Sequence, residues 1–267
     1  MKAHIHFAHA NGFPSASYRR MLDHLAGDGD VKTLPLIGHD PDYPVTNNWP
    51  HLKRQLIDSI ERQCDRPVIG LGHSLGGGLT MMAALERPDL FSAIIMLDVP
   101  LFNWFESWVV RSVKALGLID NLTPAGRSKH RRRHWTNSEE ASEYFKSRGL
   151  FRNFHQDCLQ DYLASATRPA DDGGVELAYE VTVELAVFRT IPHTLWFKPG
   201  QLRVPAGVIL GRETDTVCKH QYLRMKHKLG LVGTRIPGSH MFPLEHPDDT
   251  ATEVTRLIQQ LYQQRAA

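Results

Sequence analysis

The fold of this chain is decided by the stretch Val68-Ile69-Gly70-Leu71-Gly72-His73-Ser74-Leu75-Gly76-Gly77. The stretch begins as an apolar run typical of a buried strand and continues into a helical pattern over Leu75–Glu86. Between them lies G-x-S-x-G, which places Ser74 on a sharp strand-to-helix turn. Gly72 and Gly76 must be small, because side chains there would collide in so tight a turn. A glycine-rich turn with an incidental serine is the alternative, but it does not account for the flanking strand and helix.

Around this turn, short β-branched apolar runs alternate with longer amphipathic segments, which is the pattern of βαβ units. We therefore predict an α/β fold with a parallel sheet. The predicted strands are His4–Ala8, Val31–Leu34, Pro67–Leu71, Ala93–Leu97, Gly207–Leu210 and Gly233–Ile236. The predicted helices are Tyr18–Leu25, His51–Arg62, Leu75–Glu86, Lys219–Leu229 and Asp248–Gln264.

The alternation stops between Leu101 and about Pro205, where the sequence is mostly helical, aromatic and basic. A loop of that length without structure of its own would be unusual. We therefore expect residues 1–100 and 206–267 to form the core domain, and residues 101–205 to form a helical cap inserted over one end of the sheet.

The charge balance gives no reason to expect nucleic acid or an anionic membrane surface as a partner. Lys and Arg total 31 and Asp and Glu total 29, which leaves a net charge of +2. The most apolar stretch, Ala93–Val110, is interrupted by polar residues and proline, so we expect no membrane span. The N-terminus lacks the apolar run of a signal peptide, which favours a cytoplasmic protein. The three cysteines lack disulfide or zinc spacing; they are Cys64, Cys158 and Cys218.

On the turn at Ser74 and the alternation around it, the chain resembles the α/β-hydrolase superfamily nearly throughout, outside the insert. The resemblance implies a nucleophilic Ser74, followed along the chain by an acid and then a histidine, with no cofactor. It argues against the dehalogenase and epoxide hydrolase branches, which carry aspartate at this position. Members usually have two further strands before the first loop, but only eight residues precede His9. We therefore expect a shortened, parallel, six-stranded sheet with Val31–Leu34 at its edge.

The first predicted strand is followed by His9-Ala10-Asn11-Gly12-Phe13-Pro14, which resembles the His-Gly-x-Pro loop that supplies an oxyanion amide in this superfamily. Two registers are open, one using the amide of Asn11 and the other that of Phe13. We favour Asn11, because His9 follows the strand directly. The residue after the nucleophile, Leu75, is expected to give the second amide. The structural alternative is a Gly-Pro turn without a catalytic role.

The triad acid suggested by the resemblance is Asp215, in the loop Gly211-Arg212-Glu213-Thr214-Asp215 after a predicted strand. Two other carboxylates remain open. Glu213 lies on the same loop, and Asp98 follows the Ala93–Leu97 strand, where active groups also gather. We favour Asp215 and interpret Asp98 as a turn or hinge carboxylate.

The expected base is His240, in Ile236-Pro237-Gly238-Ser239-His240-Met241-Phe242-Pro243 between the last strand and the last helix. His246 is the nearest alternative, but it abuts a proline at a helix start and is interpreted as structural. His4 and His6 share one face of a strand, yet no third ligand accompanies them, so no metal site is expected.

Together, these residues predict a serine carboxylesterase that cleaves small to medium apolar esters through an acyl-enzyme on Ser74, with His240 as base and Asp215 orienting it. A thioesterase, an amidase, a carbon–carbon bond hydrolase or an acyltransferase would use the same serine. A non-catalytic ligand-binding protein of this fold is a further alternative. The sequence makes no prediction of oligomeric state.

Aromatic residues near the insert are candidates for the substrate pocket. The apolar stripe in 101–116 is expected mainly to seat the cap, while Phe13, Phe102, Trp104 and Phe105 are the pocket candidates, with Trp49 and Phe188 weaker ones. The dense basic run from Arg127 to Arg133 is interpreted as a solvated face or, alternatively, as a clamp for a substrate anion.

Overall fold

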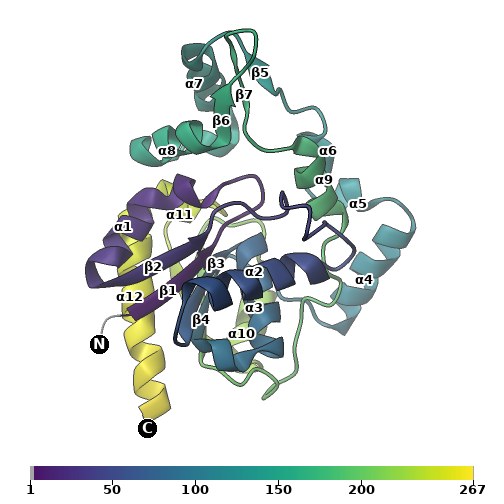
Figure 1. Ribbon diagram of the computed structural model, residues 1–267. Coiled ribbons are helices and arrows are strands. Elements are labelled where there is room, and N and C mark those ends of the chain that lie inside the picture. The colour runs from purple at the N-terminus through teal and green to yellow at the C-terminus, as the bar shows by residue number, and fades with distance from the viewer. Residues whose placement is uncertain (1–2, 267) are drawn as a thin grey trace.

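A parallel sheet forms the centre of the computed structural model, which describes residues 3–266 (Figure 1). Its six strands lie in the order β2-β1-β3-β4-β8-β9, and every neighbouring pair is parallel. The strands are β1 (Ala3–Ala8), β2 (Gly29–Leu34), β3 (Val68–His73), β4 (Phe91–Leu97), β8 (Ala206–Gly211) and β9 (Val232–Ile236). The predicted six parallel strands, with the second at an edge, are confirmed.

Helices cover both faces of this sheet. They are α1 (Arg19–Asp28), α2 (Pro50–Gln63), α3 (Leu75–Glu86), α10 (Lys219–His227) and α12 (Pro247–Ala266). Alternation along β4 shows how the faces are divided, because Ile95 packs in the cluster that includes α1 and α12, whereas Ile94 packs in the cluster that includes α2 and α3. Both faces of the strand are therefore buried, as its continuous apolar sequence requires.

Residues 119–189 of the insert lie at the end of the molecule away from the two chain termini, whereas residues 104–115 lie at the side of the core (Figure 1). Its helices are α4 (Trp104–Ala115), α5 (Ile119–Leu122), α6 (Ala125–Ser128), α7 (Ser138–Ser147), α8 (Gln156–Ala166) and α9 (Val181–Arg189). A small antiparallel sheet, which the sequence did not lead us to expect, has the order β5-β7-β6 and comprises His134–Trp135, Val175–Leu177 and Thr167–Pro169. Its strands of two or three residues are too short to show an alternating pattern.

An aromatic cluster joins the insert to the core. Phe13, which follows β1, packs against Tyr162 of α8 with ring centroids 5.1 Å apart, and against Phe151 at 5.9 Å. At the rim of this contact, Arg19 of α1 forms an ion pair with Asp161 of α8 at 2.7 Å. Residues 3–266 include no helix with both the length and the apolar character needed to cross a membrane.

Candidate active site

The turn at Ser74 has the strained geometry that its glycines permit. Ser74 joins β3 to α3 with φ 51° and ψ −112°, outside the regions that an L-residue prefers. A Cβ on Gly76 would lie 2.1 Å from the carbonyl oxygen of Ala8, so no other residue fits there without moving β1. The Ser74 amide donates to the Leu97 carbonyl at 2.9 Å, which helps to hold the strained residue in place.

His240 lies between Ser74 and a buried carboxylate. Its Nε2 is 3.1 Å from Ser74 Oγ, and its Nδ1 is 2.7 Å from Asp98 Oδ2. The Asp98 side chain is fully buried, whereas that of His240 is 22% exposed. A carboxylate acceptor at Nδ1 places the imidazole proton there and leaves Nε2 free to accept the serine hydroxyl proton.

The expectation that Asp215 pairs with His240 is wrong: the structure brings Asp98 to the histidine, and Asp215 is exposed. Strand order does not decide between them, because β8 lies between β4 and β9 and its loop also lies near His240. The difference is local: Asp98 directly follows β4, whereas Asp215 lies four residues beyond the end of β8. Asp98 turns toward His240 with φ 49°. The β8 loop contributes donors instead of the acid: the Gly211 amide is 3.1 Å from Asp98 Oδ1, and the Thr214 hydroxyl donates to Oδ2.

Other groups that the sequence singled out hold the surrounding loops. Glu213, the alternative acid, accepts a hydrogen bond from the Gly238 amide at 2.6 Å and so supports the His240 loop. Thr214, which donates to Asp98, was not expected from the sequence, since a threonine beside two carboxylates gives no signal of its own. His6 is bonded to Ser59 Oγ at 3.0 Å. Within residues 3–266, no group of three or more His, Cys, Asp or Glu side chains is arranged to hold a metal ion.

The first loop is fixed against the turn in a way that favours one oxyanion register. The amide of Gly76 donates to the His9 carbonyl at 3.1 Å, which holds the loop beside the start of α3. The Phe13 amide already donates to the Ala10 carbonyl at 3.0 Å, so the register that would use Phe13 is disfavoured. The remaining candidates are the amide of Asn11 and that of Leu75, the first residue of α3, whose N–H has no intrahelical acceptor.

A buried neutral histidine shapes this loop. His9 Nε2 accepts a hydrogen bond from the Ile37 amide at 2.9 Å, so its proton is on Nδ1, which donates to the Ala10 carbonyl at 2.8 Å. Burial lowers the pKa of His9 to about 4. The loop is therefore held by an uncharged ring through the neutral pH range.

The structure separates the four pocket candidates. Phe13 is buried at the contact with the cap, and Phe102 is partly buried against the core. Trp104 and Phe105 are instead 77% and 54% exposed on the outer side of α4, which corrects the expectation that they line a pocket. The expectation that the apolar stripe seats the cap is also wrong for much of its length, because Phe105, Trp108 and Leu116 are exposed. Helical spacing alone does not say which face of α4 is turned to the core. Of the weaker candidates, Trp49 is buried, with Nε1 3.1 Å from the Val187 carbonyl, and Phe188 is half-buried.

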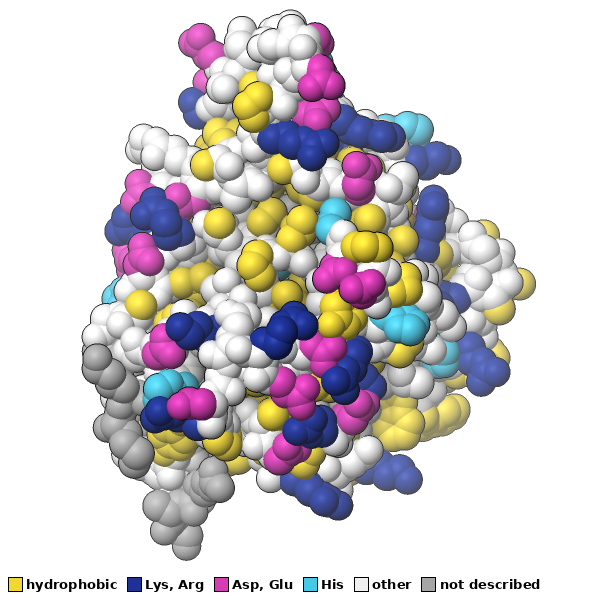
Figure 2. Space-filling model, viewed as in Figure 1, with side chains coloured by type: hydrophobic (Ala, Val, Ile, Leu, Met, Phe, Trp, Pro, Cys, Tyr) yellow, Lys and Arg dark blue, Asp and Glu magenta, His cyan; other side chains and the backbone are white. Residues whose placement is uncertain are grey.

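Within the basic run, one side chain turns inward. Arg131 pairs with the buried Glu184 at 2.9 Å, whereas Arg132 pairs with Glu140 at 2.6 Å at the surface. The side chain of Arg127 lies outside the described part. On the face seen in Figure 2, Lys and Arg side chains lie interspersed with Asp and Glu. Most of the described run therefore matches a solvated face, and Arg131 ties together segments of the insert.

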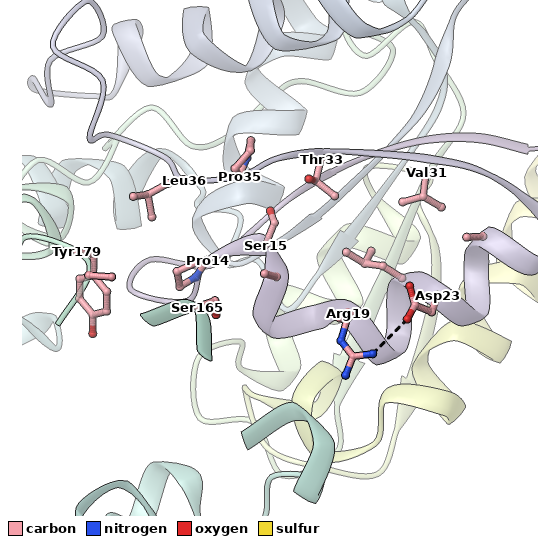
Figure 3. Close-up of a pocket in the computed structure, with 14 residues that line it drawn as sticks. Pro14, Ser15, Arg19, Asp23, Val31, Thr33, Pro35, Leu36, Ser165 and Tyr179 are labelled. Atoms are coloured by element: carbon pink, nitrogen blue, oxygen red, sulfur yellow. Dashed lines mark ion pairs between the residues drawn. The ribbon is translucent and has the colours of Figure 1, made fainter. Parts of the chain in front are cut away.

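A cavity of about 550 Å³ lies beside the loop that follows β1, between the sheet edge at β2 and the insert (Figure 3). Pro14 and Ser15 line it from the loop side, and Tyr179 lines it from the insert. Its described lining includes none of the three hydrogen-bonded residues Ser74, Asp98 and His240. This cavity is therefore separate from the candidate active site.

Comparison with protein families and curated sequences gives consistent matches. Residues 7–253 match the model described as "Alpha/beta hydrolase family". The monoglyceride lipase of Mus musculus is 28% identical over 131 residues, which are 46% of this chain and 43% of that protein. An uncharacterized hydrolase of Bacillus subtilis (strain 168) is 27% identical over 92 residues, 33% of this chain and 34% of that protein. The chain thus aligns with less than half the length of either relative.

Solved structures share the fold along nearly the whole chain. An E-2-(acetamidomethylene)succinate hydrolase superimposes with a TM-score of 0.75 at 18% identity, covering 97% of this chain and 91% of that one. A thioesterase domain from the curacin biosynthetic pathway gives a TM-score of 0.71 at 14% identity, covering 95% and 91%. At such identities the likeness concerns the fold.

Proposed function

Because the chain belongs to the α/β-hydrolase family, we propose that it is a serine hydrolase that cleaves carboxylic esters through an acyl-enzyme on Ser74. The observation that carries this proposal is the continuous hydrogen-bonded series of Ser74, His240 and Asp98. The series combines a nucleophile, a base and a buried carboxylate that orients the base, which is the arrangement needed for nucleophilic acyl transfer.

The proposed reaction uses four proton transfers at one nitrogen, His240 Nε2. His240 Nε2 takes the hydroxyl proton of Ser74 as Oγ attacks the ester carbonyl, and the buried Asp98 carboxylate stabilises the imidazolium that results. The amides of Asn11 and Leu75 donate to the oxyanion. His240 then gives its proton to the leaving alcohol, which departs as the acyl-enzyme forms. A water molecule, deprotonated at the same Nε2, attacks the acyl-enzyme. The bond to Ser74 Oγ then breaks, Oγ receives the proton from Nε2, and the acid is released.

The proposed substrates are small to medium, fairly apolar esters, with residues 101–205 acting as the cap over the site. Apolar selectivity is supported by the aromatic contact of Phe13 with Phe151 and Tyr162, where the cap meets the oxyanion loop. The names of similar proteins include a monoglyceride lipase and a thioesterase domain. Oxygen esters and thioesters are therefore the bonds to compare first, since the same serine serves both.

The test is covalent labelling with a small fluorophosphonate, followed by peptide mass spectrometry. We expect one adduct on Ser74, no adduct in Ser74→Ala, and unchanged labelling in the matched control Ser138→Ala, which removes an exposed hydroxyl in the insert. A folded wild-type protein that stays unlabelled while a known serine hydrolase reacts would overturn the proposal. A panel of matched oxygen esters, thioesters and amides would then identify the bond for a protein that labels.

A further inference from the structure

A second histidine lies behind the candidate triad and has no part in the reaction proposed above. His73 immediately precedes Ser74, and its side chain is fully buried. Its Nδ1 is 2.7 Å from the Tyr18 hydroxyl, and its Nε2 is 2.9 Å from the carbonyl oxygen of His240. The Tyr18 oxygen is in turn 3.4 Å from the amide nitrogen of Ala10. One chain of hydrogen bonds therefore joins the oxyanion loop to the backbone of the proposed base.

When His73 is neutral, the chemistry of the two ends fixes the position of every proton in this chain. The His240 carbonyl can only accept, so His73 must carry its proton on Nε2. His73 Nδ1 must then accept, and the Tyr18 hydroxyl donates to it. The Ala10 amide can only donate, so the Tyr18 oxygen accepts from it. All three contacts are satisfied when His73 is neutral and in its Nε2–H form.

Burial keeps the His73 ring neutral and the Tyr18 hydroxyl protonated. Tyr18 and His73 are each fully buried, and the His73 ring lies 5.0 Å from the His240 ring. Burial lowers the pKa of His73 well below its ordinary value, and the neighbouring His240 lowers it further. Burial also raises the pKa of Tyr18 above its ordinary value. The chain thus remains uncharged while His240 gains and loses its proton.

We propose that Tyr18 and His73 are positioning residues that set the oxyanion loop and the His240 loop in register across the Ser74 turn. The proposal rests on the proposed function, since it assigns these residues a role in the same reaction. The hydrogen bond from His73 is made to the main chain of His240 itself, while neighbouring residues are held separately: Gly238 by Glu213, and Ser239 by Glu245. Losing the hydrogen bonds of Tyr18 and His73 would therefore loosen His240 while the neighbouring residues of its loop stay in place.

The first experiment replaces Tyr18 by phenylalanine. This change removes the hydroxyl but keeps the ring that packs against Phe7 at 4.8 Å. On an ester accepted by the wild-type protein, we expect kcat and the fluorophosphonate labelling rate to fall about tenfold with KM unchanged, because one ordinary hydrogen bond no longer orients the base. The matched control is Tyr43→Phe, which removes a hydroxyl bonded to Asp58 on another part of the core, and it should leave kcat unchanged.

The second experiment detects the hydrogen bonds of His73 without any substrate. In protein carrying 15N-labelled histidine, His73 should show a neutral ring protonated on Nε2 from pH 5 to pH 8, and Tyr18→Phe should shift its Nδ1 resonance. A His73 ring that titrates in this range, or that carries its proton on Nδ1, would overturn the proposal, as would a Tyr18→Phe variant with wild-type kcat. Failure of Ser74 to label would refute the proposed function separately, because the His73 resonances do not depend on catalysis.

Discussion

Replacing Asp98 by asparagine tests the carboxylate that the structure places beside His240, where the sequence had favoured Asp215. The fully buried carboxylate accepts three hydrogen bonds, from the Gly211 amide, the Thr214 hydroxyl and His240 Nδ1. Asparagine keeps the size of the side chain but has only one acceptor oxygen. If that oxygen serves Gly211, the new NH2 group faces His240 and Thr214. His240 then accepts at Nδ1 and carries its proton on Nε2, where it can no longer take the proton of Ser74.

The magnitude follows from this change of tautomer. In serine triads, the same substitution lowers kcat by about 10⁴-fold with little change in geometry. Thr214 can rotate to relieve its own contact here, so a range of about 10³- to 10⁴-fold is expected for kcat/KM. This corresponds to about 4 to 5.5 kcal/mol of lost transition-state stabilisation.

The assay compares Asp98→Asn with Asp215→Asn, which removes the exposed carboxylate that the sequence favoured. We would measure the second-order rate of fluorophosphonate labelling at Ser74 and the hydrolysis of a p-nitrophenyl ester, with circular dichroism to check folding. Asp215→Asn should stay within about threefold of wild type, as expected for an exposed side chain when Asp98 is the carboxylate that pairs with His240. The reasoning is refuted if Asp98→Asn retains more than a tenth of wild-type activity, or if Asp215→Asn loses as much as Asp98→Asn.

Three further changes test other parts of the structure. Thr214→Val removes a donor to Asp98 and should lower kcat/KM about tenfold, measured on the same ester. Gly76→Ala places a methyl group 2.1 Å from the Ala8 carbonyl oxygen and should lower the thermal midpoint by more than about 10 °C or prevent folding. Burial lowers the pKa of His6 to about 4. Between pH 7 and pH 5 this histidine therefore binds a proton in the unfolded chain but not in the folded protein. The free energy of unfolding should fall by about 2 kcal/mol over this range because of His6. Urea titrations should show that His6→Gln loses this share of the pH dependence.

Local sterics account for most of what the sequence predicted. The glycines at 72 and 76 and the apolar run before them specify a strand, a strained turn and a helix within a few residues, and the structure has all three. Periodicity located the remaining strands of the main sheet to within a few residues. Ser74 was found from its own motif. His240 was expected from the residue order that the family resemblance implies and from its place between the last strand and the last helix, and the structure places the two 3.1 Å apart.

Which side chains of different loops contact one another was decided only by the tertiary structure. Asp98 and Asp215 both follow buried strands, and the sequence did not distinguish them. In the folded loops the Asp98 side chain reaches His240, whereas Asp215 is exposed. The outward orientation of Trp104, and the bridge from Tyr18 through His73, likewise depend on segments distant in the chain. A strand or a turn is fixed by interactions among neighbouring residues, whereas the contacts of a loop side chain depend on which other loops the sheet brings beside it.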